Sequence, residues 1–82
     1  MLHYIIYDYK NTKVAVFDDY MYAHYVLGLL GKDVYKVKKK NKPSIKKVYV
    51  GYIKVMDNDK PCFEQHFAYC KKGLYDTINK QL

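Results

Sequence analysis

With 82 residues, the chain suffices for one small domain with a single core and leaves little room for an enclosed active site. Half of its residues are apolar, a count that includes eleven tyrosines, so intrinsic disorder is not expected. Fifteen lysines, no arginine and eight acidic residues give a net charge of +7, which argues against a mimic of DNA and favours an anionic partner.

The N-terminal residues are typical of neither a signal peptide nor a membrane span. Met1–Asp8 has no basic region before an apolar run, and no apolar stretch in the chain approaches ~20 residues. We therefore expect a cytoplasmic protein, in the host cytosol if a phage encodes it, with no membrane partner. Cys62 and Cys70 would lie about 12 Å apart on one helix, so we expect two reduced thiols.

A β-hairpin is predicted at the start of the chain. His3–Tyr9 is aromatic and β-branched, Lys10–Lys13 is polar, and Val14–Phe17 is apolar again. This succession is typical of two antiparallel strands with a short connection.

A helix is predicted from Tyr20 to Leu30. Its apolar residues recur at helical spacing: Ala23, Val26, Leu27 and Leu30. Asp18 or Asp19 can cap its N-terminus by accepting from exposed amides, and Gly28 and Gly31 are available near its C-terminus.

The middle of the chain supports two predictions. By residue propensity, 33–38 and 45–55 are two strands joined through Asn41–Ser44, which gives the order ββαββα. By residue spacing, Gly28–Gly31 is a turn and Lys32–Lys40 is a second short helix, which gives a helix-turn-helix. In this alternative only the later apolar run, residues 45–55, is a strand.

The C-terminal part is predicted to be a loop followed by a helix. Asp57–Pro61 has the composition of a loop, and the apolar residues after it recur at three- and four-residue steps: Phe63, Phe67, Cys70, Leu74 and Ile78. The whole chain is therefore expected to be a single α+β domain over residues 1–82. It comprises an N-terminal β-hairpin, a central helix, a helix-turn-helix-like or β-hairpin segment, a closing strand and a C-terminal helix.

The densest run of positive charge follows the first predicted helix. A surface of this kind is typical of proteins that meet phosphates, and tyrosines beside the lysines can stack on bases or bond a phosphate. The residues predicted to contact nucleic acid are Lys32, Tyr35, Lys36, Lys38, Lys39, Lys40, Lys42, Lys46 and Lys47, with Tyr49 as a further candidate. Lysine lacks the planar fork that reads guanine with two bonds, so we expect backbone contact with weak sequence specificity.

One pattern of residues extends over roughly residues 3–55. It consists of Ile6-Tyr7-Asp8, then Val16-Phe17 followed by Asp19, Ala23, Val26, Leu27 and Gly28, then Val34, and finally the closing strand Tyr49–Ile53. This pattern resembles the small modular helix-turn-helix DNA-binding motif found beside homing endonuclease domains and in short phage proteins. In that family a hairpin leads into a capped helix that ends in Leu-Gly. Without an endonuclease module, the resemblance implies DNA binding without cleavage.

The remaining residues do not favour a metal site or an enzyme. Cys62, His66 and Cys70 lie four residues apart and would share a helical stripe, but the spacing marks no fourth zinc ligand. No acidic residue forms a recognisable catalytic pair with a histidine, no third group orients a Cys–His nucleophile, and no glycine-rich phosphate loop exists. We therefore expect a protein that is not an enzyme and holds no cofactor.

Two functions remain open from the sequence. The first is a small, phage-type nucleic-acid-binding protein that contacts the DNA or RNA backbone through residues 32–47. The second is an inhibitor or adaptor of the anti-CRISPR type, which binds a host or defence protein complex with its charges and exposed tyrosines. The sequence does not determine the oligomeric state.

Overall fold

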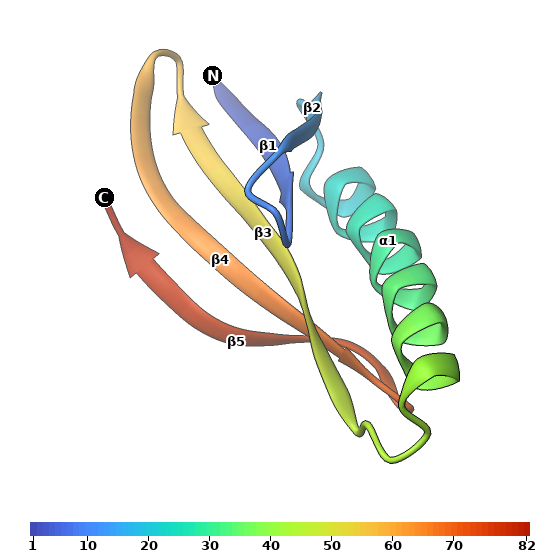
Figure 1. Cartoon of the computed structure of the whole chain (residues 1–82). Coiled ribbons are helices and arrows are strands. Elements are labelled where there is room, and N and C mark those ends of the chain that lie inside the picture. Colours follow the sequence, from blue (N-terminus) through green and yellow to red (C-terminus); the bar gives the residue numbers. More distant parts are fainter.

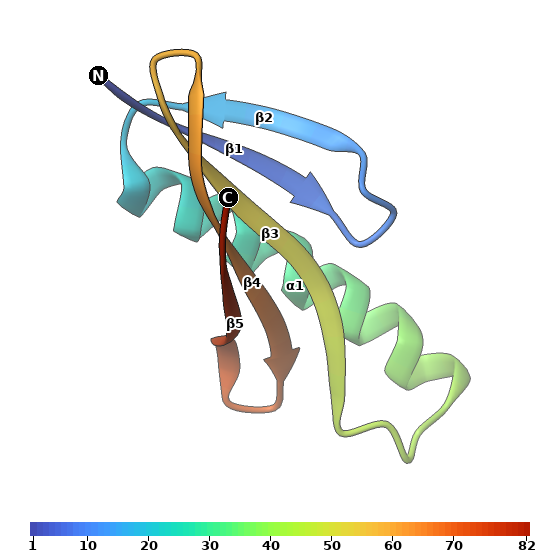
Figure 2. The same ribbon diagram turned by 90° about the vertical axis from the view of Figure 1, so that its left-hand side faces the viewer.

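The computed structural model describes all 82 residues as five strands and one helix. In chain order the elements are β1 (Leu2–Asp8), β2 (Lys13–Phe17), α1 (Tyr20–Asn41), β3 (Lys47–Asp57), β4 (Lys60–Cys70) and β5 (Gly73–Gln81). The strands form one sheet in the order β2-β1-β3-β4-β5, and every neighbouring pair is antiparallel. α1 packs against one face of this sheet and leaves the other face uncovered (Figure 1 and Figure 2). The predicted α+β class, N-terminal hairpin and central helix are confirmed.

The β1–β2 hairpin turns through the polar segment that the sequence indicated. The Asp8 carboxylate accepts from the backbone amides of Lys10 and Thr12, each at 2.9 Å. Asn11 takes a φ of 63°, a conformation that asparagine tolerates better than most residues. The turn is therefore built by Asp8 and Asn11 together.

α1 begins at its predicted cap and continues without a break to Asn41. Asp19 accepts from the amide of Met21 at 3.1 Å. The predicted turn at Gly28–Gly31 is wrong, and so are the separate second helix and the alternative strand over 33–38, because all of these residues belong to α1. No helix in the structure combines the length and the apolarity that crossing a membrane requires.

Gly31 is a contact residue, which explains why a glycine interrupts the helical sequence without ending the helix. A Cβ built on Gly31 would lie 2.8 Å from Cδ2 of Tyr69 and 3.0 Å from Cγ2 of Val50. The missing side chain lets α1 approach β3 and β4 closely. The same glycine that indicated a turn in the sequence is therefore required by the packing of helix on sheet.

The core lies between α1 and the central strands. Its largest fully buried side chains come from β1, α1, β3 and β4: Ile6, Leu27, Val50, Ile53 and Phe67. The predicted closing strand over 45–55 is confirmed as β3, which occupies the middle of the sheet between β1 and β4. Burial of these apolar side chains is the main force that holds the helix on the sheet.

The predicted C-terminal helix is wrong, because residues 60–81 form the two strands β4 and β5. Four-residue steps such as Phe63 to Phe67 suit one face of a helix, but they are also even steps and suit one face of a strand equally well. The pairing of β4 with β3 decides between the two, and two turns connect the strands. Asn58 adopts a φ of 55° between β3 and β4, and Gly73 adopts a φ of 114° after the Lys71-Lys72 turn.

Candidate nucleic-acid interface

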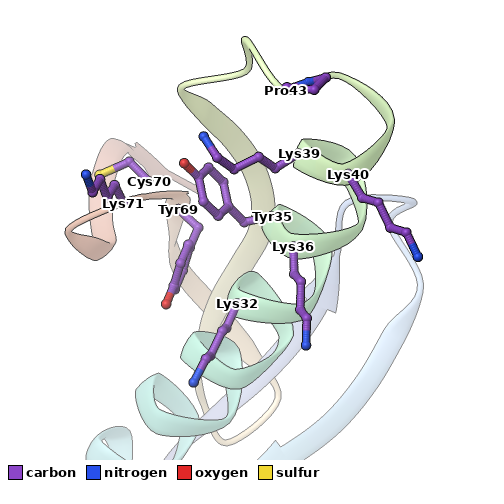
Figure 3. A pocket seen from close by; sticks show the side chains of 9 residues that line it. All are labelled: Lys32, Tyr35, Lys36, Lys39, Lys40, Pro43, Tyr69, Cys70 and Lys71. Atoms are coloured by element: carbon purple, nitrogen blue, oxygen red, sulfur yellow. The ribbon is translucent and has the colours of Figure 1, made fainter.

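The C-terminal half of α1 carries four lysines that line one groove. Lys32, Lys36, Lys39 and Lys40 all line it, and all four are exposed. Residues three and four apart in a helix are neighbours on its surface. Lys32, Lys36 and Lys40 therefore follow one another along the helix, whereas Lys39 lies beside this row and points towards Tyr35 (Figure 3).

The groove has a volume of about 650 Å³ and lies between this part of α1 and the β4–β5 turn. Its far wall is made by Tyr69, Cys70 and Lys71, and Pro43 closes it beyond the end of the helix. Figure 3 shows Tyr35 and Tyr69 between the two elements, with the helix lysines projecting from successive turns. Two segments more than twenty-five residues apart in the sequence therefore build one site.

Two tyrosines provide the aromatic surface of the groove. The rings of Tyr35 and Tyr69 lie 5.7 Å apart between centroids and are inclined by 45°. The Nζ atom of Lys39 lies 5.6 Å from the centroid of the Tyr35 ring, within the range of a cation–π contact. The groove thus combines positive charge with aromatic rings.

The positive charges of the groove are not neutralised within the protein. The structure contains two ion pairs, between the Met1 α-amino group and Asp57 and between His66 and Glu64, and neither involves a lysine. Asp33 is the only acidic residue of α1, and it does not line the groove. Ammonium groups gathered in this way repel one another, so an anion in the groove would stabilise the arrangement.

Support of the helix C-terminus accounts for only part of this lysine cluster. Lys38, Lys39 and Lys40 lie in the last turn of α1, where cations interact favourably with the helix dipole. That effect falls off within one turn, so it does not explain Lys32 and Lys36. It also does not explain Lys71, which belongs to another element.

The structure brings together five of the nine residues predicted to contact nucleic acid. Lys32, Tyr35, Lys36, Lys39 and Lys40 line the groove. Lys38 points to the other side of α1, where its Nζ lies 5.4 Å from the centroid of the Tyr9 ring. Lys38 and Lys47 line a separate depression with Tyr49, whereas Lys42 and Lys46 line neither hollow and are exposed beside β3 and the end of α1.

The residues that form the far wall of the groove are not among those predicted from the sequence. A C-terminal helix over this region would not bring Tyr69, Cys70 and Lys71 beside residues 32–40, whereas the β4–β5 hairpin does. The signal that would have found them is Lys71-Lys72-Gly73, which has the composition of a tight hairpin turn. A hairpin there returns the chain along β4 and brings Lys71 to the end of α1.

The predicted stripe of Cys62, His66 and Cys70 has a different geometry in the structure. All three lie on β4, where four residues span about 13 Å, so they do not share one site. No three His, Cys, Asp or Glu side chains come close enough to hold a metal ion together. Both cysteines are free.

His66 instead belongs to a polar cluster on the uncovered face of the sheet. The Tyr49 hydroxyl and Nδ1 of His66 lie 2.7 Å apart, and Nε2 of His66 lies 3.1 Å from Oε1 of Glu64. Burial raises the pKa of the Tyr49 and Tyr52 hydroxyls above their ordinary value of 10.0, with the negative charge of Glu64 as a further cause. Both tyrosines are therefore neutral hydrogen-bonding groups at physiological pH.

Comparison with family models, curated proteins and solved structures finds no match for this chain. The structure has the hairpin and the capped start of α1, but it contains no helix-turn-helix. The turn after Leu27-Gly28 and the separate second helix are not formed. The groove is therefore the feature of this protein that indicates a function.

Proposed function

We propose that this protein binds nucleic acid without cleaving it and holds the sugar-phosphate backbone in the groove between α1 and the β4–β5 turn. The observation that carries the proposal is that five lysines from two separate elements line one groove, with no acidic residue among its lining and no lysine paired to a carboxylate. Phosphates are the ligands that neutralise such a row and release counterions when they bind.

The side chains available favour backbone contact over sequence recognition. Each lysine offers a compact charge on a flexible stem, which suits phosphate oxygens, whereas the chain has no arginine to read guanine with two parallel bonds. The hydroxyls of Tyr35 and Tyr69 can add hydrogen bonds to phosphate or sugar. Affinity is thus expected to depend strongly on salt and weakly on sequence.

The test is fluorescence anisotropy with labelled single-stranded and duplex oligonucleotides between about 50 and about 200 mM salt. Lys36→Gln/Lys39→Gln removes two groove charges, and Lys13→Gln/Lys60→Gln is the matched control, because it removes two exposed charges that do not line the groove. For a single strand, the slope of log K against log salt should become less steep by about 1.4 in the groove variant and stay unchanged in the control.

Three results would contradict this proposal. Absence of binding by the wild-type protein at low salt would remove nucleic acid as the ligand. Equal loss of affinity in the groove and control variants would show that the net charge, and not the groove, attracts the oligonucleotide. Tighter binding to polyglutamate than to an oligonucleotide of equal charge would favour an acidic protein surface instead.

A further inference from the structure

The uncovered face of the sheet carries a row of stacked rings across three strands. Tyr7 of β1 pairs in register with Tyr52 of β3, and Tyr52 pairs with His66 of β4. Their centroids are 4.8 and 4.7 Å apart, with interplanar angles of 14° and 29°. These separations equal the spacing of adjacent strands, so each ring stacks on the next as the sheet is crossed.

The row of rings ends at His66 of β4, and a pocket of about 380 Å³ lies beyond it, between β4 and β5. The pairing of β4 with β5 shifts register between Gln65 and Phe67, beside His66, and β5 offers no ring there. The pocket is bounded by His66 and Tyr49 on one side and by Ile78, Asn79 and Lys80 of β5 on the other, with Glu64 beside His66. A planar ring placed in it would stack on His66 and extend the row by one.

His66 is held for this role by hydrogen bonds at both of its nitrogens. Tyr49 lies at Nδ1 and Glu64 at Nε2, at 2.7 and 3.1 Å. A ring fixed in this way loses little conformational entropy when a ligand stacks on it. The free oxygen of Glu64 accepts no hydrogen bond within the protein and can meet the polar edge of a base. The Asn79 side chain is not available for this, because Asn79 pairs with Gln65, whose side chain bonds Tyr20 on the helix side of the sheet.

We infer that this pocket takes an unpaired base of a single-stranded nucleic acid, stacked on His66; this inference rests on the proposed function and names its ligand class. The bases of a duplex are stacked on one another, so only an unpaired base can enter such a pocket. The charge around the pocket fits a nucleotide. Lys54 and Lys80 flank Glu64 across the strands, and neither forms an ion pair.

The pocket lies next to a second hollow that contains two lysines, Lys38 of α1 and Lys47 of β3. Tyr49 borders both the base pocket and the depression lined by Lys38 and Lys47. A strand whose base stacks on His66 can therefore pass its phosphates over Tyr49 towards these two lysines. Lys38 and Lys47 would then contact the phosphates of the bound strand, although they do not line the groove.

The test compares variants that keep or remove the stacking ring. His66→Phe retains a ring, His66→Leu removes it at similar size, and Ile78→Trp fills the pocket from an exposed position on β5, where Ile78 is 68% exposed. Tyr22→Ala on the helix side is the control, since Tyr22 is exposed and lies away from the uncovered face. Far-UV circular dichroism and thermal melts establish that each variant is folded.

Single-stranded binding should weaken roughly 5- to 150-fold in His66→Leu and Ile78→Trp, the range for loss of one base–aromatic stack, and should persist in His66→Phe and Tyr22→Ala. In NMR spectra of the wild-type protein, cytidine, which carries no phosphate, should shift the ring protons of His66 and the methyl groups of Ile78. Duplex binding should be unaffected by all four variants.

The outcomes separate this inference from the proposed function. If Lys36→Gln/Lys39→Gln weakens binding but His66→Leu and Ile78→Trp do not, the base pocket is refuted and the phosphate groove stands. If cytidine shifts His66 while the groove variant binds normally, the base pocket stands and the groove is refuted. Shifts at His66 with a tryptophan peptide but none with cytidine or oligonucleotides would assign the pocket to a protein side chain and overturn the inference.

Discussion

Gly28→Ala and Gly31→Ala should change the free energy of unfolding in opposite directions, although both replace a glycine in the middle of α1. Alanine stabilises a helix interior by about 1 kcal/mol relative to glycine. A Cβ on Gly28 meets only Cδ2 of Leu74, at 4.0 Å, which is ordinary contact, so Gly28→Ala should gain most of that amount.

At Gly31 the free-energy cost of the steric overlap should exceed the gain from the higher helix propensity of alanine. The added Cβ would lie 2.8 Å from the Tyr69 ring and 3.0 Å from Val50, and Val50 is only 1% exposed and cannot move aside. Overpacking of a core costs about 1–3 kcal/mol, which leaves a net loss of about 1 kcal/mol after the helical gain. For a domain of this size, each kcal/mol corresponds to about 4–8 °C in the melting temperature.

Thermal and urea denaturation followed by circular dichroism measure both variants against the wild-type protein. Gly28→Ala should melt higher and Gly31→Ala lower. If both variants are stabilised, α1 does not pack on β3 and β4 through Gly31. If both are destabilised, the two glycines belong to a turn, and the single continuous helix is wrong.

Two further predictions concern the sheet. Gly51→Ala should destabilise the protein by about 3 kcal/mol or more, because a Cβ at its φ of 142° would overlap the carbonyl oxygen of Tyr7; Gly73→Ala, at a φ of 114° with no atom within 4 Å, should lose clearly less in the same urea titration. Stability should also decline as the pH rises above about 10. Burial raises the folded-state pKa of Tyr49 and Tyr52 above 10.0, so the unfolded chain releases these protons first and is favoured at alkaline pH. Replacing both tyrosines with phenylalanine should reduce this decline in unfolding experiments at pH 8 to 11, and an unchanged pH profile would contradict the assignment.

Local signals in the sequence predicted the N-terminal half well. Asp19 was one of two residues expected to cap the helix, and it does so. The polar segment after Asp8 became the expected turn. These features depend on contacts between residues only a few positions apart, which propensity and capping describe directly.

The errors arose where one local pattern fits two structures. Gly28 and Gly31 are compatible with a turn or with close helix packing, and only the position of Tyr69 and Val50 on the sheet favours packing. Phe63 and Phe67 are four residues apart, which suits a helix and a strand alike. Hydrogen bonding of β4 to β3 makes this segment a strand, and a local sequence pattern carries no information about that pairing.

The same distinction holds for the candidate sites. The sequence by itself determined the charge, the absence of arginine and the run of lysines beside Tyr35, because composition and order are properties of the chain. It left open whether this run is a strand or a helix, and the structure makes it the C-terminal half of α1. The tertiary structure alone decided that Tyr69 and Lys71 face those lysines across a groove, and that Tyr7, Tyr52 and His66 stack in a row beside a pocket. Such contacts join residues far apart in the chain, and they form only when burial of the core brings β1, β3, β4 and α1 together.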